Sequence, residues 1–243
     1  RADHDELGLL PQPHQGAVHQ TAGQDRGRID VGVLLGHPRD RLGQQPPLGV
    51  GRRADLPDQA LLLALLAGGQ RMAQLLRAKV GDYDQDTATL RLWDGKGRRT
   101  SPREHLLPLA PRAAALVSGL VDRARAQDSA LLFSTHGTMQ LDETTPGKRV
   151  AAIAAAMAGE PFDLRDIRRT CETMLAGLGI SRDTRAQLLS HGIGGVQATH
   201  YDRHGYANEK RAALVAWEDR LHEIETGAAR SNVVRIAKGK TAA

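Results

Sequence analysis

Six side chains that can bind or attack a phosphate stand out in the sequence. Planar guanidinium groups can grip phosphate oxygens through paired hydrogen bonds, and a phenolic hydroxyl can act as a nucleophile. Taken singly, each has an ordinary explanation: a surface arginine at a helix break, a turn lysine, a solvated helix face, a helix C-cap histidine or a half-buried tyrosine. The six are Arg71, Lys96, Arg165, Arg168, His191 and Tyr201.

Four of the six lie in three short segments of the last third of the chain. These segments are Leu164 to Thr170 (LRDIRRT), Leu188 to Gly192 (LLSHG) and His200 to Asp202 (HYD). His191 follows Arg168 by 23 residues, and Tyr201 follows His191 by ten. This order and spacing closely resemble the catalytic C-terminal block of the tyrosine recombinases, the phage-integrase family.

The resemblance extends upstream. Leu66 to Leu76 (LAGGQRMAQLL) is similar to the family's first-arginine box. The stretch 87–109, with Lys96 in its turn, resembles the family's β-hairpin. The trailing segment Tyr201 to Tyr206 (YDRHGY) is most similar to integrases of prophages and genomic islands. The resemblance covers about residues 57–225 and does not reach residues 1–56.

The resemblance implies a fold and an activity. The fold is mainly α with a small antiparallel β-sheet (α+β), like a tyrosine recombinase catalytic domain. The activity is site-specific DNA recombination, the integration and excision of mobile genetic elements. It proceeds by metal-independent strand cleavage through a 3′-phosphotyrosyl intermediate and rejoining. The implied partner is double-stranded DNA, bound by a homo-tetramer, with no cofactor, metal or small-molecule substrate.

The resemblance also implies a role for each residue. Tyr201 is the nucleophile, and Arg71 and Arg168 clamp the phosphate. Lys96 is the general acid that protonates the leaving 5′ oxygen. His191 hydrogen-bonds the phosphate.

Four further points concern these roles. Arg165 stands where a histidine often precedes the second arginine; it shares a helix face with Arg168 but stays protonated, so it cannot act as a base. Gln74 stands where an acidic residue often supports the first arginine, and a neutral amide orients Arg71 less firmly. Tyr206 is the alternative nucleophile. Arg169, about 100° away from Arg168 on the helix, supports the fold or the DNA backbone.

Local patterns predict the elements that position these residues. A Leu- and Ala-rich run predicts one helix over 59–78, with Gly68-Gly69 as a weak point. A short strand starts at 79–80, and a hairpin pairs strands 87–93 and 103–109 through an Asp-Gly-Lys-Gly turn. Pro108 limits the third strand to an edge or an end. Further helices are expected at 111–125, 145–158, 164–178, 182–190, 198–204 and 208–225.

Composition limits the class of protein. Aromatic residues make up only 3% of the 243 residues, so the core must be built mainly from aliphatic side chains, which favours helices. A single cysteine, Cys171, excludes an intramolecular disulfide and a cysteine-based zinc site. No apolar run approaches the ~18 residues of a membrane span, and no signal peptide is visible. We therefore expect a bacterial cytoplasmic protein associated with the nucleoid.

The two ends differ from the middle of the chain. Residues 1–56 contain nine Gly and five Pro and carry seven Lys/Arg against seven Asp/Glu, which predicts a disordered or non-native segment. Residues 226–243 carry four Lys/Arg and no acid, so most of the net charge of +5 lies in a flexible basic tail. The catalytic domain is expected at 57–225. Its last helix carries an apolar stripe that packs on its own core or on a neighbouring copy.

Three other interpretations fit part of the sequence. A truncated integrase remnant would fold without recombining DNA. A non-catalytic module would use helices 164–178 and 182–190 as a helix-turn-helix, but this leaves Lys96 and Tyr201 unexplained. A type IB topoisomerase would share the chemistry, and only the integrase-like tail separates it.

Overall fold

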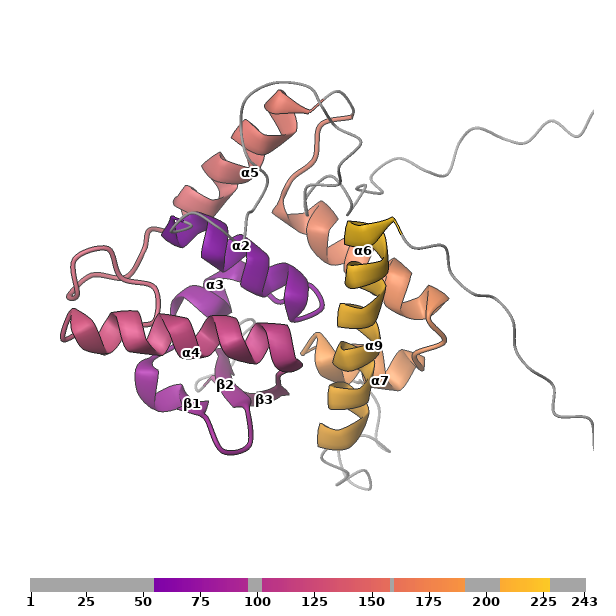
Figure 1. Cartoon of the computed structure of the whole chain (residues 1–243), viewed down its shortest axis with the longest axis horizontal. Coiled ribbons are helices and arrows are strands. Elements are labelled where there is room, and N and C mark those ends of the chain that lie inside the picture. Colours follow the sequence, from indigo (N-terminus) through magenta and orange to yellow (C-terminus); the bar gives the residue numbers. More distant parts are fainter. Residues whose placement is uncertain (1–54, 96–101, 158–159, 191–205, 228–243) are drawn as a thin grey trace, which may run out of the picture.

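A computed structural model describes residues 55–95, 102–157, 160–190 and 206–227 of the chain (Figure 1). In this part the protein is mainly helical with one three-stranded antiparallel sheet, which confirms the predicted fold class. The described part contains no helix with the length and apolarity that a membrane crossing requires. The elements are α2 (Leu56–Leu66), α3 (Met72–Leu76), the 3-10 helix η1 (Val80–Asp82), β1 (Tyr83–Asp84), β2 (Thr89–Asp94), β3 (Arg103–Pro108), α4 (Pro111–Ala126), α5 (Thr144–Ala156), α6 (Leu164–Gly177), α7 (Arg182–Leu188) and α9 (Ala207–Thr226).

Helix α2 forms the centre of the core. Seven of its residues are buried, all of them Leu or Ala. It contacts α3, α4, α5, α6 and α9, and Figure 1 shows α2 between α5 above and α4 below, with α6 and α9 to its right. Because its apolar residues lie all round the helix, α2 is stable only when other elements cover it on several sides.

The single helix predicted over 59–78 is wrong, because the chain breaks at the glycine pair. Gly68 and Gly69 adopt φ values of +75° and +89°, a conformation that side-chain-bearing residues rarely take. The Gly69 amide donates to the Ala64 carbonyl at 2.7 Å, which closes α2 and turns the chain back. A Cβ at Gly69 would lie 3.0 Å from the Arg168 Cα, so glycine also allows α6 to pack closely here.

The predicted hairpin is confirmed, with the strand order β1-β2-β3. The β2–β3 register runs from Thr89 opposite Pro108 to Asp94 opposite Arg103. Pro108 therefore ends an edge strand, as expected. Of the short strand predicted to start at 79–80, only an isolated antiparallel bridge between Lys79 and Leu131 forms; Val80 begins η1, and the sheet strand is β1.

The caps of α6 and α7 hold their ends in place. Asp163 accepts hydrogen bonds from the amides of Arg165 and Asp166, and Asp166 bonds back to the Asp163 amide, forming a capping box. Ser181 accepts from the Thr184 amide and caps α7. These caps fix the ends of the two helices that flank the candidate site.

Helix α9 packs on the core of its own chain. Trp217 is fully buried, and its indole N–H donates to the Leu65 carbonyl at 2.7 Å. The Glu218 carboxylate accepts from the first amides of α4, those of Arg112 at 3.0 Å and Ala113 at 2.9 Å. The apolar stripe therefore covers α2 within the molecule. The predicted helix at 198–204 falls outside the described ranges.

Candidate active site

Arg71 projects from the turn between α2 and α3, where it is the N-cap of α3. The preceding residue, Gln70, is buried, and its side-chain amide donates to the Ala67 carbonyl at 2.9 Å and to the Leu188 carbonyl at 3.0 Å. The turn that carries Arg71 is therefore attached to the end of α7. The Arg71 side chain is 24% exposed, so its guanidinium is reachable from solvent.

Arg168 lies on α6 and faces the same turn. One terminal nitrogen of its guanidinium donates to the Gly69 carbonyl at 2.7 Å, and the other to the Leu189 carbonyl at 2.6 Å. Two backbone carbonyls from distant parts of the chain thus set its orientation. A planar fork with a fixed spacing between donors suits this arrangement, which a lysine cannot reproduce.

The two arginines influence each other electrostatically. Burial, followed by the positive charge of Arg71, lowers the pKa of Arg168 to about 10. Arg168 still carries a proton at neutral pH. Two guanidiniums close enough to repel each other form a positively charged site, and an anion placed between them would relieve that repulsion.

A buried carboxylate connects this pair to two other parts of the site. Asp94, at the end of β2, is 5% exposed, and one of its oxygens accepts from Arg71 Nη1 at 3.2 Å and from Ser190 Oγ at 3.1 Å. Arg103, opposite Asp94 in the hairpin, donates to Ser190 Oγ at 2.7 Å and to its carbonyl at 3.1 Å. Asp94 stands two residues before Lys96, and Ser190 directly before His191.

Arg165 lies apart from this cluster. Its side chain is 89% exposed, and its guanidinium donates to the Asp163 carboxylate at 2.7 Å and 3.0 Å. The structure brings Arg71 and Arg168 together but leaves Arg165 on the surface of α6. Arg169 is also exposed and pairs with Asp166 at 2.6 Å, away from the cluster.

The sequence did not reveal the residues that hold Arg71. Gln74 is buried, but neither polar atom of its side chain has a hydrogen-bond partner in the described part. The carboxylate beside Arg71 comes instead from Asp94, which the sequence pattern assigned only to a hairpin turn. The alternation of β2 gave one usable signal, because it places Asp94 on the same buried face as Leu90 and Leu92.

Residues 49–206, more than half of the chain, match the phage integrase family. The chain belongs to this family. This integrase is 35% identical over 134 residues to tyrosine recombinase XerC of Haemophilus ducreyi, covering 54% of this chain and 42% of the relative. The integrase from mycobacterium phage Brujita has a similar fold, with a TM-score of 0.52 at 16% identity over 91% of this chain and 66% of that one. The integrase thus spans less than two thirds of the length of both.

Three predicted site residues of this integrase fall outside the described ranges: Lys96, His191 and Tyr201. Tyr206, the alternative nucleophile, is described. It is half-buried, has φ +50° and forms the N-cap of α9. The assignment of the nucleophile to Tyr201 stays a prediction.

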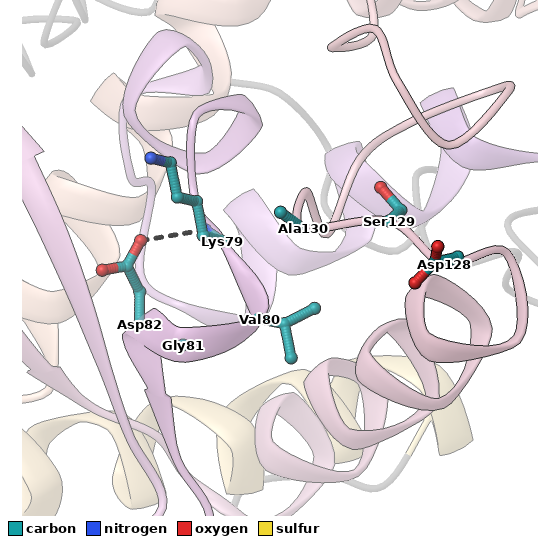
Figure 2. Close-up of a pocket in the computed structure, with 7 residues that line it drawn as sticks. All are labelled: Lys79, Val80, Gly81, Asp82, Asp128, Ser129 and Ala130. Atoms are coloured by element: carbon teal, nitrogen blue, oxygen red, sulfur yellow. Dashed lines mark hydrogen bonds between the residues drawn. The ribbon is translucent and has the colours of Figure 1, made fainter.

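A separate pocket of about 610 Å³ lies between residues 79–82 and 128–130 (Figure 2). The Lys79 amide donates to the Asp82 carboxylate at 2.9 Å at its edge. Arg71, Arg165 and Arg168, the predicted site residues that the structure describes, do not line it. Within the described ranges no three His, Cys, Asp or Glu residues form a group that could hold a metal ion. The Cys171 thiol is buried, and burial raises its pKa to about 12.

Proposed function

We propose that this integrase cleaves and rejoins DNA strands in site-specific recombination, integrating or excising mobile DNA. One observation carries the proposal: Arg71 and Arg168, far apart in sequence, converge on the turn at Gly69. Asp94, two residues before Lys96, and Ser190, directly before His191, are hydrogen-bonded to each other beside Arg71. Such a positive site suits a phosphodiester, whose developing charge lies on the non-bridging oxygens.

In the proposed reaction the Tyr201 hydroxyl attacks phosphorus. A bond forms between the tyrosine oxygen and the 3′ phosphate, while the bond to the 5′ oxygen breaks. Lys96 gives its proton to that leaving oxygen, and the tyrosine proton passes to His191 or to water. Rejoining reverses the step with the 5′ hydroxyl of another strand, so bond energy is kept in the phosphotyrosyl link.

A covalent-adduct assay tests this proposal. The full chain is incubated with nicked suicide duplexes, tiled across the DNA that flanks the coding sequence and supplemented by a pool with a randomised core. The release of a short strand from the nick prevents rejoining, so a protein–DNA adduct that survives a denaturing gel is the expected product. Tyr201→Phe abolishes it, because the nucleophilic oxygen is lost.

Tyr206→Phe is the matched control, since it removes the same atom five residues later. It should retain the adduct. An adduct that survives Tyr201→Phe but not Tyr206→Phe transfers the role to Tyr206. DNA binding without any adduct, under conditions in which the chain is folded, supports a binding module or an inactive remnant and contradicts the proposal.

The proposal includes the assembly on DNA. Double-stranded DNA is the partner, and four copies joined on two sites form the active complex in the cytoplasm, at the nucleoid. Because the buried face of α9 packs on its own core, the contacts between copies do not use that face. Mass photometry of the chain with and without duplex DNA checks the assembly: tetramers should form only with DNA, and monomers on every duplex would contradict it.

A further inference from the structure

Asp94 is a buried carboxylate for which the proposed chemistry has no direct use. It is shielded from solvent, since only 5% of the residue is exposed. A buried charge is costly unless it is paired and hydrogen-bonded. Here one carboxylate oxygen accepts from a guanidinium at 3.2 Å and from a hydroxyl at 3.1 Å.

The contacts of Asp94 connect three elements. Arg71 comes from the start of α3, Asp94 and Arg103 from the paired ends of β2 and β3, and Ser190 from the turn after α7. Ser190 is 3% exposed and has φ +53°, a strained conformation for a serine that its surroundings must hold. Arg103 does so by binding both its hydroxyl and its carbonyl.

The geometry leaves Arg71 available for a ligand. Asp94 bonds to Nη1, while a guanidinium has five N–H donors. The remaining donors lie on a side chain that is 24% exposed. An arginine fixed at one nitrogen and open at the others is oriented before a phosphate arrives, and catalytic groups benefit from such preorganisation.

We propose that Asp94 is the positioning residue for Arg71, and that it couples the orientation of this guanidinium to the base of the hairpin and to the Ser190 turn. The inference rests on the proposed strand-cleavage function. Asp94 acts through Arg71 and does not touch the DNA. Ser190 and Arg103 hold the carboxylate in place from the other side.

The test compares the rate of adduct formation with DNA affinity. Asp94→Asn keeps the size of the side chain but removes the charge that orients Arg71. We expect single-turnover adduct formation to slow by about 10- to 100-fold, since a misplacement of about 1 Å costs on the order of 10². DNA affinity, measured by fluorescence anisotropy with the same duplex, stays equal or becomes tighter because a negative charge is removed.

Asp58→Asn is the matched control. Asp58 also pairs with an arginine, Arg149, through hydrogen bonds at 2.5 Å and 3.1 Å, but this pair joins α2 to α5. Its loss should affect stability and leave the adduct rate within about twofold of the unmodified chain. Equal rates for Asp94→Asn and Asp58→Asn overturn the proposal.

A double-mutant cycle distinguishes positioning from general structural support. If Asp94 acts through Arg71, Asp94→Asn slows an Arg71→Ala protein by less than about twofold. Full additivity of the two losses overturns the proposal. If Asp94→Asn does not fold, Ser190→Ala is the substitute, because it removes the Ser190 hydrogen bond to the carboxylate oxygen that also binds Arg71. Adduct formation should then slow by about threefold, and this slowing should again be absent in the Arg71→Ala background.

A readout without DNA separates this inference from the proposed function. The Nε–Hε signal of Arg71 is assigned in a ¹⁵N spectrum by its disappearance in Arg71→Lys. In Asp94→Asn it should shift and broaden, because the guanidinium gains rotational freedom, while in Asp58→Asn it should not move. An unchanged signal in Asp94→Asn refutes positioning even if the enzyme cleaves DNA. A shifted signal in a chain that forms no adduct upholds positioning and refutes strand cleavage.

Discussion

The two arginines of the candidate site are held in different ways. Arg71, on the hairpin side, bonds to the Asp94 carboxylate, whereas Arg168, on the α6 side, bonds to the carbonyls of Gly69 and Leu189. A carboxylate balances charge as well as orienting the group, while a carbonyl only orients it. The pKa of Arg168 is lowered to about 10 by burial and by the charge of Arg71. The α6 side therefore relies on geometry and the hairpin side on charge.

The largest expected effect comes from replacing the geometrically held arginine. Arg168→Lys puts a single ammonium in place of the two nitrogens that donate to the carbonyls of Gly69 and Leu189. The rate of adduct formation should fall by about 10²–10³, the usual cost of losing one preorganised donor. Arg71→Lys keeps a cation that can still pair with Asp94, so its loss should be on the order of tenfold. Single-turnover kinetics of both variants compare the two sides, and equal losses would remove the distinction between them.

The contact between the sides depends on Gly69. Gly69→Ala forces a side chain into φ +89° and places its Cβ 3.0 Å from both the Arg168 Cα and the Cys171 Cβ. We expect the free energy of unfolding to fall by about 2–3 kcal/mol in urea titrations. Gly119→Ala is the control: it adds a Cβ with nothing within 4 Å in the middle of α4 and should stabilise the protein by about 0.5–1 kcal/mol. Similar destabilisation in both variants would contradict the close packing.

The hairpin side should also respond to acid through His105. Burial, followed by the positive charges of Lys210 and Arg103, lowers the pKa of His105 to about 3. His105 therefore takes up a proton near pH 6.5 in the unfolded chain but stays neutral at that pH in the folded protein. The folded state keeps its full stability above pH 6.5 and loses stability as the pH falls towards 3. Between pH 7 and 5.5 the loss from this residue is about 1 kcal/mol.

His105→Gln removes this titration while keeping a neutral side chain with a hydrogen-bond donor. Urea unfolding at the two pH values should show the unmodified protein losing about 1 kcal/mol more stability than the variant. Identical pH dependence of the two proteins would mean that His105 is not held neutral in the folded state.

The smallest effect on stability is expected at Arg165. Its side chain is 89% exposed, so Arg165→Ala should leave the urea midpoint unchanged. If Arg165 nevertheless contributes to phosphate binding, adduct formation falls by about tenfold, while the neighbouring Arg169→Ala leaves it unchanged. Equal activities of the two variants would assign Arg165 to the surface of α6 alone.

Local patterns predicted most of the fold. The hairpin and the positions of α4, α6 and α7 follow from turn chemistry, helix-end signals and periodicity within a few residues. The prediction of one helix over 59–78 is wrong because helix propensity favours a continuous helix through a Leu- and Ala-rich run. Only the close passage of α6 and the left-handed glycines explain the break at Gly69.

The sequence by itself determined the family and predicted six site residues, because residue types and spacing can be read without knowledge of contacts. Only the tertiary structure decided how they are held: Asp94 rather than Gln74 beside Arg71, carbonyls around Arg168, and Arg165 turned towards Asp163. The physical reason is the separation along the chain of the groups that interact. Turns and caps form between near neighbours, whereas the partners of a buried charge are chosen by packing between segments that are distant in sequence.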